Sequence, residues 1–164
     1  MKKIFLTSLI ILLLFSCGCT WFSTGADKVF EKAGMKLTLT DEFQEENMEG
    51  FTVCYSSSKV AVLCIKEPFE TNPDFVNLSE EDYMNLVRET NSKLAPSAIE
   101  KIDGLVSITY TVSGKESYDY FTVAYKAPDG FWLLQFCSRS KDYQEQKTNI
   151  LKWAKAVRFE GQAQ

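Results

Sequence analysis

The residues of this chain that could do chemistry are few, and their spacing favours none of the common catalytic sites. The chain has no histidine, which excludes Ser-His-Asp and Cys-His catalysis and any zinc site built with histidine. Ser56 and Lys59 have the S-x-x-K spacing of penicillin-binding proteins, a motif that works from the start of a helix. Here the pair lies in a turn between two expected strands, so we predict no nucleophile there.

A run of acidic residues is the other candidate for a site, and its members are Asp41, Glu42, Glu45, Glu46 and Glu49. Ca²⁺ needs six to eight oxygen ligands, and an EF-hand loop supplies them from alternating positions around a central glycine. The run lacks both features, so we expect a solvated loop over 41–50 and no metal or other cofactor. A pair of carboxylates from separate parts of the fold could still form a hydrolytic site. Because no pair is distinguished by the sequence, we predict that the protein is not an enzyme.

The first seventeen residues are typical of an exported protein. Lys2 and Lys3 precede an apolar stretch over 4–15, which is shorter than the ~20 residues that a membrane-spanning helix needs. The sequence Leu14-Phe15-Ser16-Cys17 then resembles the lipobox of bacterial lipoproteins. This resemblance implies a signal peptide over 1–16 and a lipid on Cys17, whereas the alternative is an ordinary secretory signal cut nearby.

A lipid on Cys17 would place the protein on the extracytoplasmic face of the cell membrane. Two acyl chains are enough to hold a soluble domain at a bilayer. The chain has a formal charge of −4 and a pI near 5.0, so its own surface would not be drawn to anionic lipids or to nucleic acid. We therefore predict attachment through Cys17, a tether over 17–26 and no nucleic-acid partner.

Three further cysteines, Cys54, Cys64 and Cys137, lie in apolar runs. Cys54 and Cys64 belong to an expected hairpin in which they point to opposite faces of the sheet. No C-x-x-C motif is present. We favour buried free thiols over a redox or metal site made of the three.

Alternating apolar residues, turn residues and helical spacing predict an α+β domain over 27–160, followed by a tail over 161–164. Short connections require antiparallel pairing of the strands, and we expect an antiparallel sheet with helices packed on one face. The expected strands cover 35–40, 51–55, 60–65, 105–112, 117–126 and 131–138, and the expected helices begin at Ser79 and Ser140.

The carboxyl-terminal part of this domain resembles PsbP-like bacterial domains. The resemblance rests on the strand at 130–136, on Asp142-Tyr143, and on the ending over 150–159, where Ala156 replaces a serine that is usual in the family. The segment 34–39 is similar to the family's opening strand. Uncharacterised lipoproteins carrying such domains are also similar. The resemblance implies a sheet flanked by helices and a docking or accessory role, and no functional residue follows from it.

Aromatic residues give the remaining functional signal, since the chain has 12 Phe, 7 Tyr and 3 Trp. In the strand at 117–126, alternation places Tyr118 and Tyr120 on one face and Phe121 and Tyr125 on the other. We predict that Tyr118 and Tyr120 contact an unknown protein partner, although cross-strand pairing that stabilises the sheet would also explain them. The predicted function is thus non-catalytic binding by a lipid-anchored protein. The alternative is a small-ligand carrier with a pocket between sheet and helices.

Overall fold

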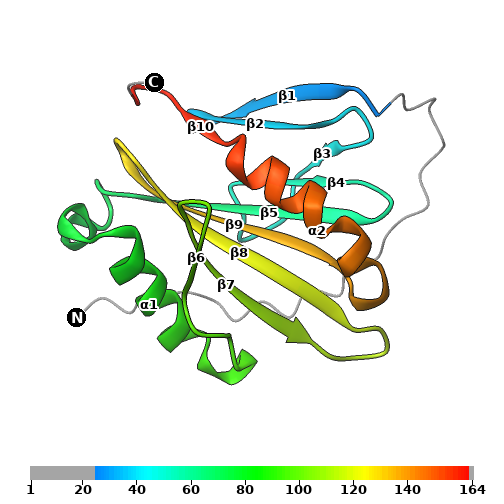
Figure 1. The fold of residues 1–164 in the computed structure, drawn as a ribbon. Helices are drawn as coiled ribbons and strands as arrows, with labels where there is room; N and C mark the ends of the chain where they lie inside the picture. The colour runs from blue at the N-terminus through cyan, green and yellow to red at the C-terminus, as the bar shows by residue number, and fades with distance from the viewer. Residues whose placement is uncertain (1–24, 163–164) are drawn as a thin grey trace.

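The computed structural model describes residues 25–162, which form two antiparallel sheets and two α-helices (Figure 1). The predicted signal peptide and Cys17 lie outside the described residues. The elements are β1 (Asp27–Lys32), β2 (Met35–Thr40), β3 (Gln44–Glu46), β4 (Val53–Ser56), β5 (Val60–Pro68), the 3₁₀ helix η1 (Pro73–Asn77), α1 (Glu80–Thr90), the 3₁₀ helix η2 (Ser92–Leu94), β6 (Glu100–Ile102), β7 (Leu105–Val112), β8 (Tyr118–Ala127), β9 (Gly130–Arg139), α2 (Ser140–Lys155) and β10 (Arg158–Phe159).

The larger sheet has seven strands in the order β3-β4-β5-β9-β8-β7-β6, and the smaller has three in the order β1-β2-β10. The hairpins β4–β5, β7–β8 and β8–β9 join neighbours in sequence, as their short turns require. The long strand β9 returns to pair with β5 and brings the two halves of the chain together. The predicted α+β class with an antiparallel sheet is confirmed.

The two helices pack on opposite faces of the larger sheet, which corrects the prediction that they share one face (Figure 1). Met84 of α1 packs with Ala124 and Leu133, whereas Ile150 of α2 packs with Val123 and Leu134. Neighbouring residues of one strand point to opposite faces, so β8 and β9 are covered on both sides around Val123–Ala124 and Leu133–Leu134. Such strands carry nearly continuous apolar runs rather than alternating ones, as β9 does with its Phe-Trp-Leu-Leu-Gln-Phe-Cys sequence.

Helix α1 begins where its sequence predicts, at a complete capping box. The hydroxyl of Ser79 accepts a hydrogen bond from the Asp82 amide at 3.1 Å, and the Asp82 carboxylate accepts one from the Ser79 amide at 3.1 Å. These bonds satisfy two amides that the first helical turn leaves without partners. The capping box therefore fixes the residue at which helix α1 begins.

Helix α2 carries the apolar stripe that closes the main core. Ile150 and Trp153 lie in one cluster with Trp132 and Leu134 of β9, as expected from their spacing. The hydroxyl of Tyr125 donates a hydrogen bond to the Ala154 carbonyl at 2.8 Å. The smaller sheet packs on the same cluster through alternate residues of β2, a role that its period of two predicts.

The three described cysteines are free and buried. Val53 faces Cys64 across the β4–β5 hairpin, and Cys54 faces Leu63. The turn at 56–59 predicts Tyr55 opposite Val60, whereas in the structure Tyr55 lies opposite Val62, two residues further along. A shift of two positions keeps every side chain on its face, so Cys54 and Cys64 still point to opposite sides of the sheet, into different clusters.

Candidate functional site

One part of the larger sheet's α1 side is lined by aromatic side chains rather than by the helix. We call it the aromatic face, and it consists of Phe51, Tyr110, Val112, Tyr118 and Tyr120. These residues cluster over Leu63 and Cys137 from the strands beneath. Among residues 25–162, that cluster contains no helical residue. It is therefore the part of this sheet side that is available to something other than the protein's own helices.

The strand register explains why the rings gather at one place. Tyr110 of β7 lies directly opposite Tyr120 of β8, and Val112 lies opposite Tyr118. Opposed residues of antiparallel strands point to the same face. The rings of Tyr110 and Tyr120 stack, with centroids 4.7 Å apart and an interplanar angle of 7°.

Tyr118 and Tyr120 share the predicted face, but they differ in exposure. Tyr118 is partly exposed, whereas Tyr120 is only 6% exposed. The burial of Tyr120, whose ring stacks against that of Tyr110, does not fit the prediction that it contacts a partner together with Tyr118. Tyr110, Val112 and Phe51 were not predicted as site residues from the sequence. Tyr110 and Val112 could have been found from the short turn at 113–117, because the length of this turn sets the strand register. In that register Tyr110 lies opposite Tyr120, and Val112 lies opposite Tyr118.

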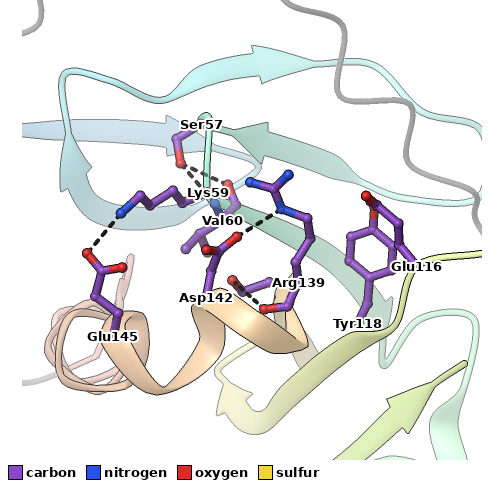
Figure 2. Close-up of polar contacts among 9 residues, drawn as sticks. Ser57, Lys59, Val60, Glu116, Tyr118, Arg139, Asp142 and Glu145 are labelled. Carbon is purple, nitrogen blue, oxygen red and sulfur yellow. Dashed lines mark hydrogen bonds and ion pairs between the residues drawn. The ribbon is translucent and has the colours of Figure 1, made fainter.

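The tyrosine hydroxyls at this face have polar partners. The Tyr110 hydroxyl donates a hydrogen bond to Gln135 Oε1 at 2.8 Å. The Tyr118 hydroxyl donates one to Glu116 Oε2 at 3.0 Å, and Figure 2 shows these two residues side by side. Burial raises the pKa of Tyr110, and burial together with Glu116 raises the pKa of Tyr118. Both hydroxyls are therefore neutral at physiological pH and serve as hydrogen-bonding groups, not as bases.

Charged residues border Tyr118 where β9 runs into α2 (Figure 2). Arg139 lies opposite Tyr118 in the sheet and pairs with Asp142 at 2.9 Å. Lys59, in the β4–β5 turn, pairs with Glu145 of α2 at 2.8 Å. The exposed Lys59–Glu145 pair adds little stability. The partly buried Arg139 and Asp142 lie closer to Tyr118 and give that end of the aromatic face a polar edge.

The S-x-x-K pair does not form a catalytic arrangement. The Ser56 hydroxyl donates a hydrogen bond to the Glu46 carboxylate, and the Lys59 ammonium group forms an ion pair with Glu145. Both residues belong to the strand end and turn of a hairpin, as the sequence predicts, and the motif requires a helix start.

The acidic run is partly a strand, which corrects the expected loop over 41–50. Gln44–Glu46 form β3 at the sheet's edge. Glu45 pairs with Lys32 at 2.7 Å, and Asp41 accepts a hydrogen bond from the Gly25 amide at 2.9 Å. Within residues 25–162, no group of three or more acidic or cysteine side chains is arranged to hold a metal ion.

A groove of about 110 Å³ opens between the aromatic face and the end of α1. Its floor includes Tyr110, Tyr120 and Gln135, and the end of α1 contributes Val87 and Asn91 to its wall. Phe51 lies on another wall. The groove offers an apolar surface with a few hydrogen-bonding groups at its base.

A second cavity, of about 330 Å³, lies on the opposite side of the sheet between α2 and the strands β6, β7 and β8. It corresponds in position to the pocket expected of a carrier. Its lining combines apolar side chains, including Phe121 and Leu151, with the charged residues Glu100, Asp119 and Lys147.

The sequence matches no family model and no curated protein. The fold is similar to that of CyanoP, the cyanobacterial PsbP of Synechocystis sp. PCC 6803, at 10% identity and a TM-score of 0.57, covering 87% of this chain and 97% of that one. It is also similar to Mog1p, a Ran-binding protein of Saccharomyces cerevisiae, at 9% identity and a TM-score of 0.52, covering 83% and 96% of the two chains. The expected PsbP-like fold is thus confirmed.

In residues 25–162, no helix is long and apolar enough to cross a membrane.

Proposed function

We propose that this protein is a lipid-anchored, extracytoplasmic binding protein that holds a protein partner on its aromatic face and catalyses no reaction. The observation that carries the proposal is the clustering of tyrosines on a sheet surface that the helices leave open. Tyrosine suits an interface because it offers a large apolar area together with a polar tip. Tyr118 lies at the accessible end of the cluster and is the residue that we expect to contact the partner.

The size of the adjoining groove favours a protein over a small molecule. Pockets for small ligands usually hold about 300–1,000 Å³, whereas this groove holds about 110 Å³. A space of that size suits one inserted side chain. The hydrogen-bonding groups of Tyr110 and Gln135 at the floor would fix its orientation.

The solved structures are compatible with such a role. Mog1p is named as a Ran-binding protein, so a protein of this fold is known to bind another protein. The low identity means that only the fold is shared, and the partner of this chain is expected to be different.

The anchor part of the proposal rests on the lipobox resemblance at Leu14–Cys17. A lipid on Cys17 would be separated from β1 by a tether that ends at residue 26. Extended chain covers at most about 3.5 Å per residue, so the domain would stay within a few tens of ångströms of the membrane. A partner on the aromatic face would accordingly be another protein of the same membrane surface.

The proposal is tested by comparing three full-length proteins as bait in detergent extracts of cell envelope. The Tyr118→Ala bait should retain much less of the partner protein than the unchanged bait does. Val29→Ala removes an apolar side chain that is 56% exposed on β1, in the other sheet. This control bait should retain as much of the partner as the unchanged bait does. Equal retention by the Tyr118→Ala and unchanged proteins would refute binding through this face.

Carriage of a small ligand is a second candidate, favoured by the cavity of about 330 Å³ between α2 and the sheet. Its volume lies at the lower end of the range of ligand pockets. It lies on the opposite side of the sheet from the side chains of the aromatic face, so the two functions can be tested separately.

A further inference from the structure

The cavity beneath α2 combines an apolar wall with a polar edge. Thr109 of β7 lies opposite Phe121 of β8, and Thr111 lies opposite Asp119, so these four side chains share the face that α2 covers. Phe121 is buried and belongs to the main core. Ile102, Ile150 and Leu151 extend the apolar wall. A ligand in this cavity would meet apolar side chains at one end and oxygen atoms at the other.

Two carboxylates and one ammonium group carry the charge of the lining. Asp119 Oδ1 accepts a hydrogen bond from the Thr111 hydroxyl at 2.7 Å, which orients the carboxylate and leaves lone pairs of both oxygens for other donors. Glu100 and Lys147 complete the charged set. Within the described part of the chain, none of these three side chains forms an ion pair. The lining therefore has a net negative charge.

Tyr143 of α2 completes the polar edge of the cavity. Its side chain is 8% exposed, and burial raises its pKa, with the nearby charges of Asp119 and Glu100 acting in the same direction. The hydroxyl is therefore neutral at physiological pH and can accept or donate a hydrogen bond. Asp119 on β8 lies opposite Thr111, whereas Glu100 on β6 lies opposite Ser107, so the two carboxylates border the cavity at different positions.

We propose that the cavity binds a small amine with an apolar body. The ammonium group would lie against the Asp119 carboxylate, and the apolar body would lie along Phe121, Ile150 and Leu151. A carboxylate accepts strong charge-assisted hydrogen bonds from an ammonium donor, and a monocation neutralises the net charge of the lining. This inference rests on the carrier candidate, not on partner binding at the aromatic face.

Calorimetric titration of the full-length protein with three probes tests the inference. Phenethylamine, 3-phenylpropan-1-ol and 3-phenylpropionate have similar apolar bodies and differ in charge. Phenethylamine should bind, and each of the other two should bind at least about tenfold more weakly. Asp119→Asn keeps the size of the side chain and removes its charge. It should weaken phenethylamine binding at least about tenfold.

A matched control is Asp74→Asn, which removes an exposed carboxylate of η1 outside the cavity lining and should leave binding unchanged. Thermal melts of both variants establish that they are folded. If the alcohol or the acid binds as tightly as the amine, or if Asp119→Asn has no effect, the cavity does not select amines. Either result would overturn this inference without contradicting carriage of a small ligand. Absence of binding by all three probes at millimolar concentration would overturn both.

Discussion

The rings of Tyr110 and Tyr120 stack face to face across the two neighbouring strands β7 and β8, with their centroids 4.7 Å apart. The stack divides the aromatic face into two kinds of residue. Tyr120 is buried, whereas Tyr110 beside it is partly exposed. Tyr118, one pair further along, keeps an accessible ring. We therefore expect stability and partner binding at this face to depend on different tyrosines.

We predict that Tyr120→Ala destabilises the protein far more than Tyr118→Ala. Removing a buried aromatic side chain costs about 3–5 kcal/mol, because apolar contacts are lost and a cavity remains. Tyr118 is partly exposed, so Tyr118→Ala should cost less than about 1 kcal/mol. Urea denaturation of the two variants measures both free energies of unfolding. Equal losses would mean that Tyr118 is a core residue as much as Tyr120, and would remove the reason to place the partner there.

Much of the fold could be predicted from the sequence, because local signals were strong. The Ser79 cap and the alternation in 35–40 identified α1 and β2 correctly. The faces of β8 also followed from simple alternation. The short edge strands β3, β6 and β10 were missed, since two or three residues carry too little periodicity to be recognised. The six-residue edge strand β1 was also missed, because its two apolar residues, Val29 and Phe30, are adjacent and do not alternate with polar ones.

The placement of the helices and the depth of Tyr120 depend on tertiary contacts that alternation does not report. The continuous apolar run of β9 was the available sign that both of its faces are covered. The depth of Tyr120 depends on the ring opposite it, Tyr110, and so on the register of the hairpin. The cavity beneath α2 needs residues from β6, β7, β8 and α2 to meet, and no local pattern brings these together.

The hydrogen-bonded pair of Glu67, which is partly buried, and Tyr83, which is buried, predicts a specific dependence of stability on pH. The Tyr83 hydroxyl donates a hydrogen bond to the Glu67 carboxylate, and the ring stacks on Phe131 at 4.2 Å. Burial raises the pKa of Glu67 above its ordinary value of 4.5, and the hydrogen bond from Tyr83 only partly opposes this. The folded state therefore holds the Glu67 proton more tightly than the unfolded state does.

For this carboxyl group, stability is greatest below pH 4.5 and falls as the pH rises through the raised pKa. Glu67→Gln abolishes that fall and keeps an oxygen that can accept the Tyr83 hydrogen bond. The variant should gain free energy of unfolding relative to the unchanged protein between pH 4 and pH 7, as measured by urea denaturation at each pH. A constant difference across that range would contradict the assigned cause.

The three described thiols should be unreactive while the protein is folded. Burial raises the pKa of Cys54 and of Cys137 to about 12, and the pKa of Cys64 also rises through burial. The thiolate is the reactive form, and at pH 8 a thiol of pKa 12 is ionised in roughly one molecule in ten thousand. Peptide mass spectrometry after N-ethylmaleimide treatment should find these three unlabelled in native protein and labelled in urea. Rapid native labelling of any of them would contradict its buried placement.

The anchor proposal predicts different outcomes for two neighbouring cysteines. In cells grown with radiolabelled palmitate, the unchanged chain and Cys19→Ala should both incorporate label. Cys17→Ala should incorporate none, because it lacks the thiol that accepts the lipid. If processed Cys17→Ala protein still carries label and partitions with membranes, the attachment site lies elsewhere.

Site-specific photocrosslinking in living cells tests partner binding most directly. The photoreactive residue p-benzoylphenylalanine replaces Tyr118 on the aromatic face in one full-length protein and Val29 in another. Both positions are accessible, but Val29 lies on β1 in the other sheet. Our account predicts one discrete protein adduct from position 118 upon irradiation and none from position 29. No adduct from position 118, or the same adduct from both positions, would contradict binding at the aromatic face.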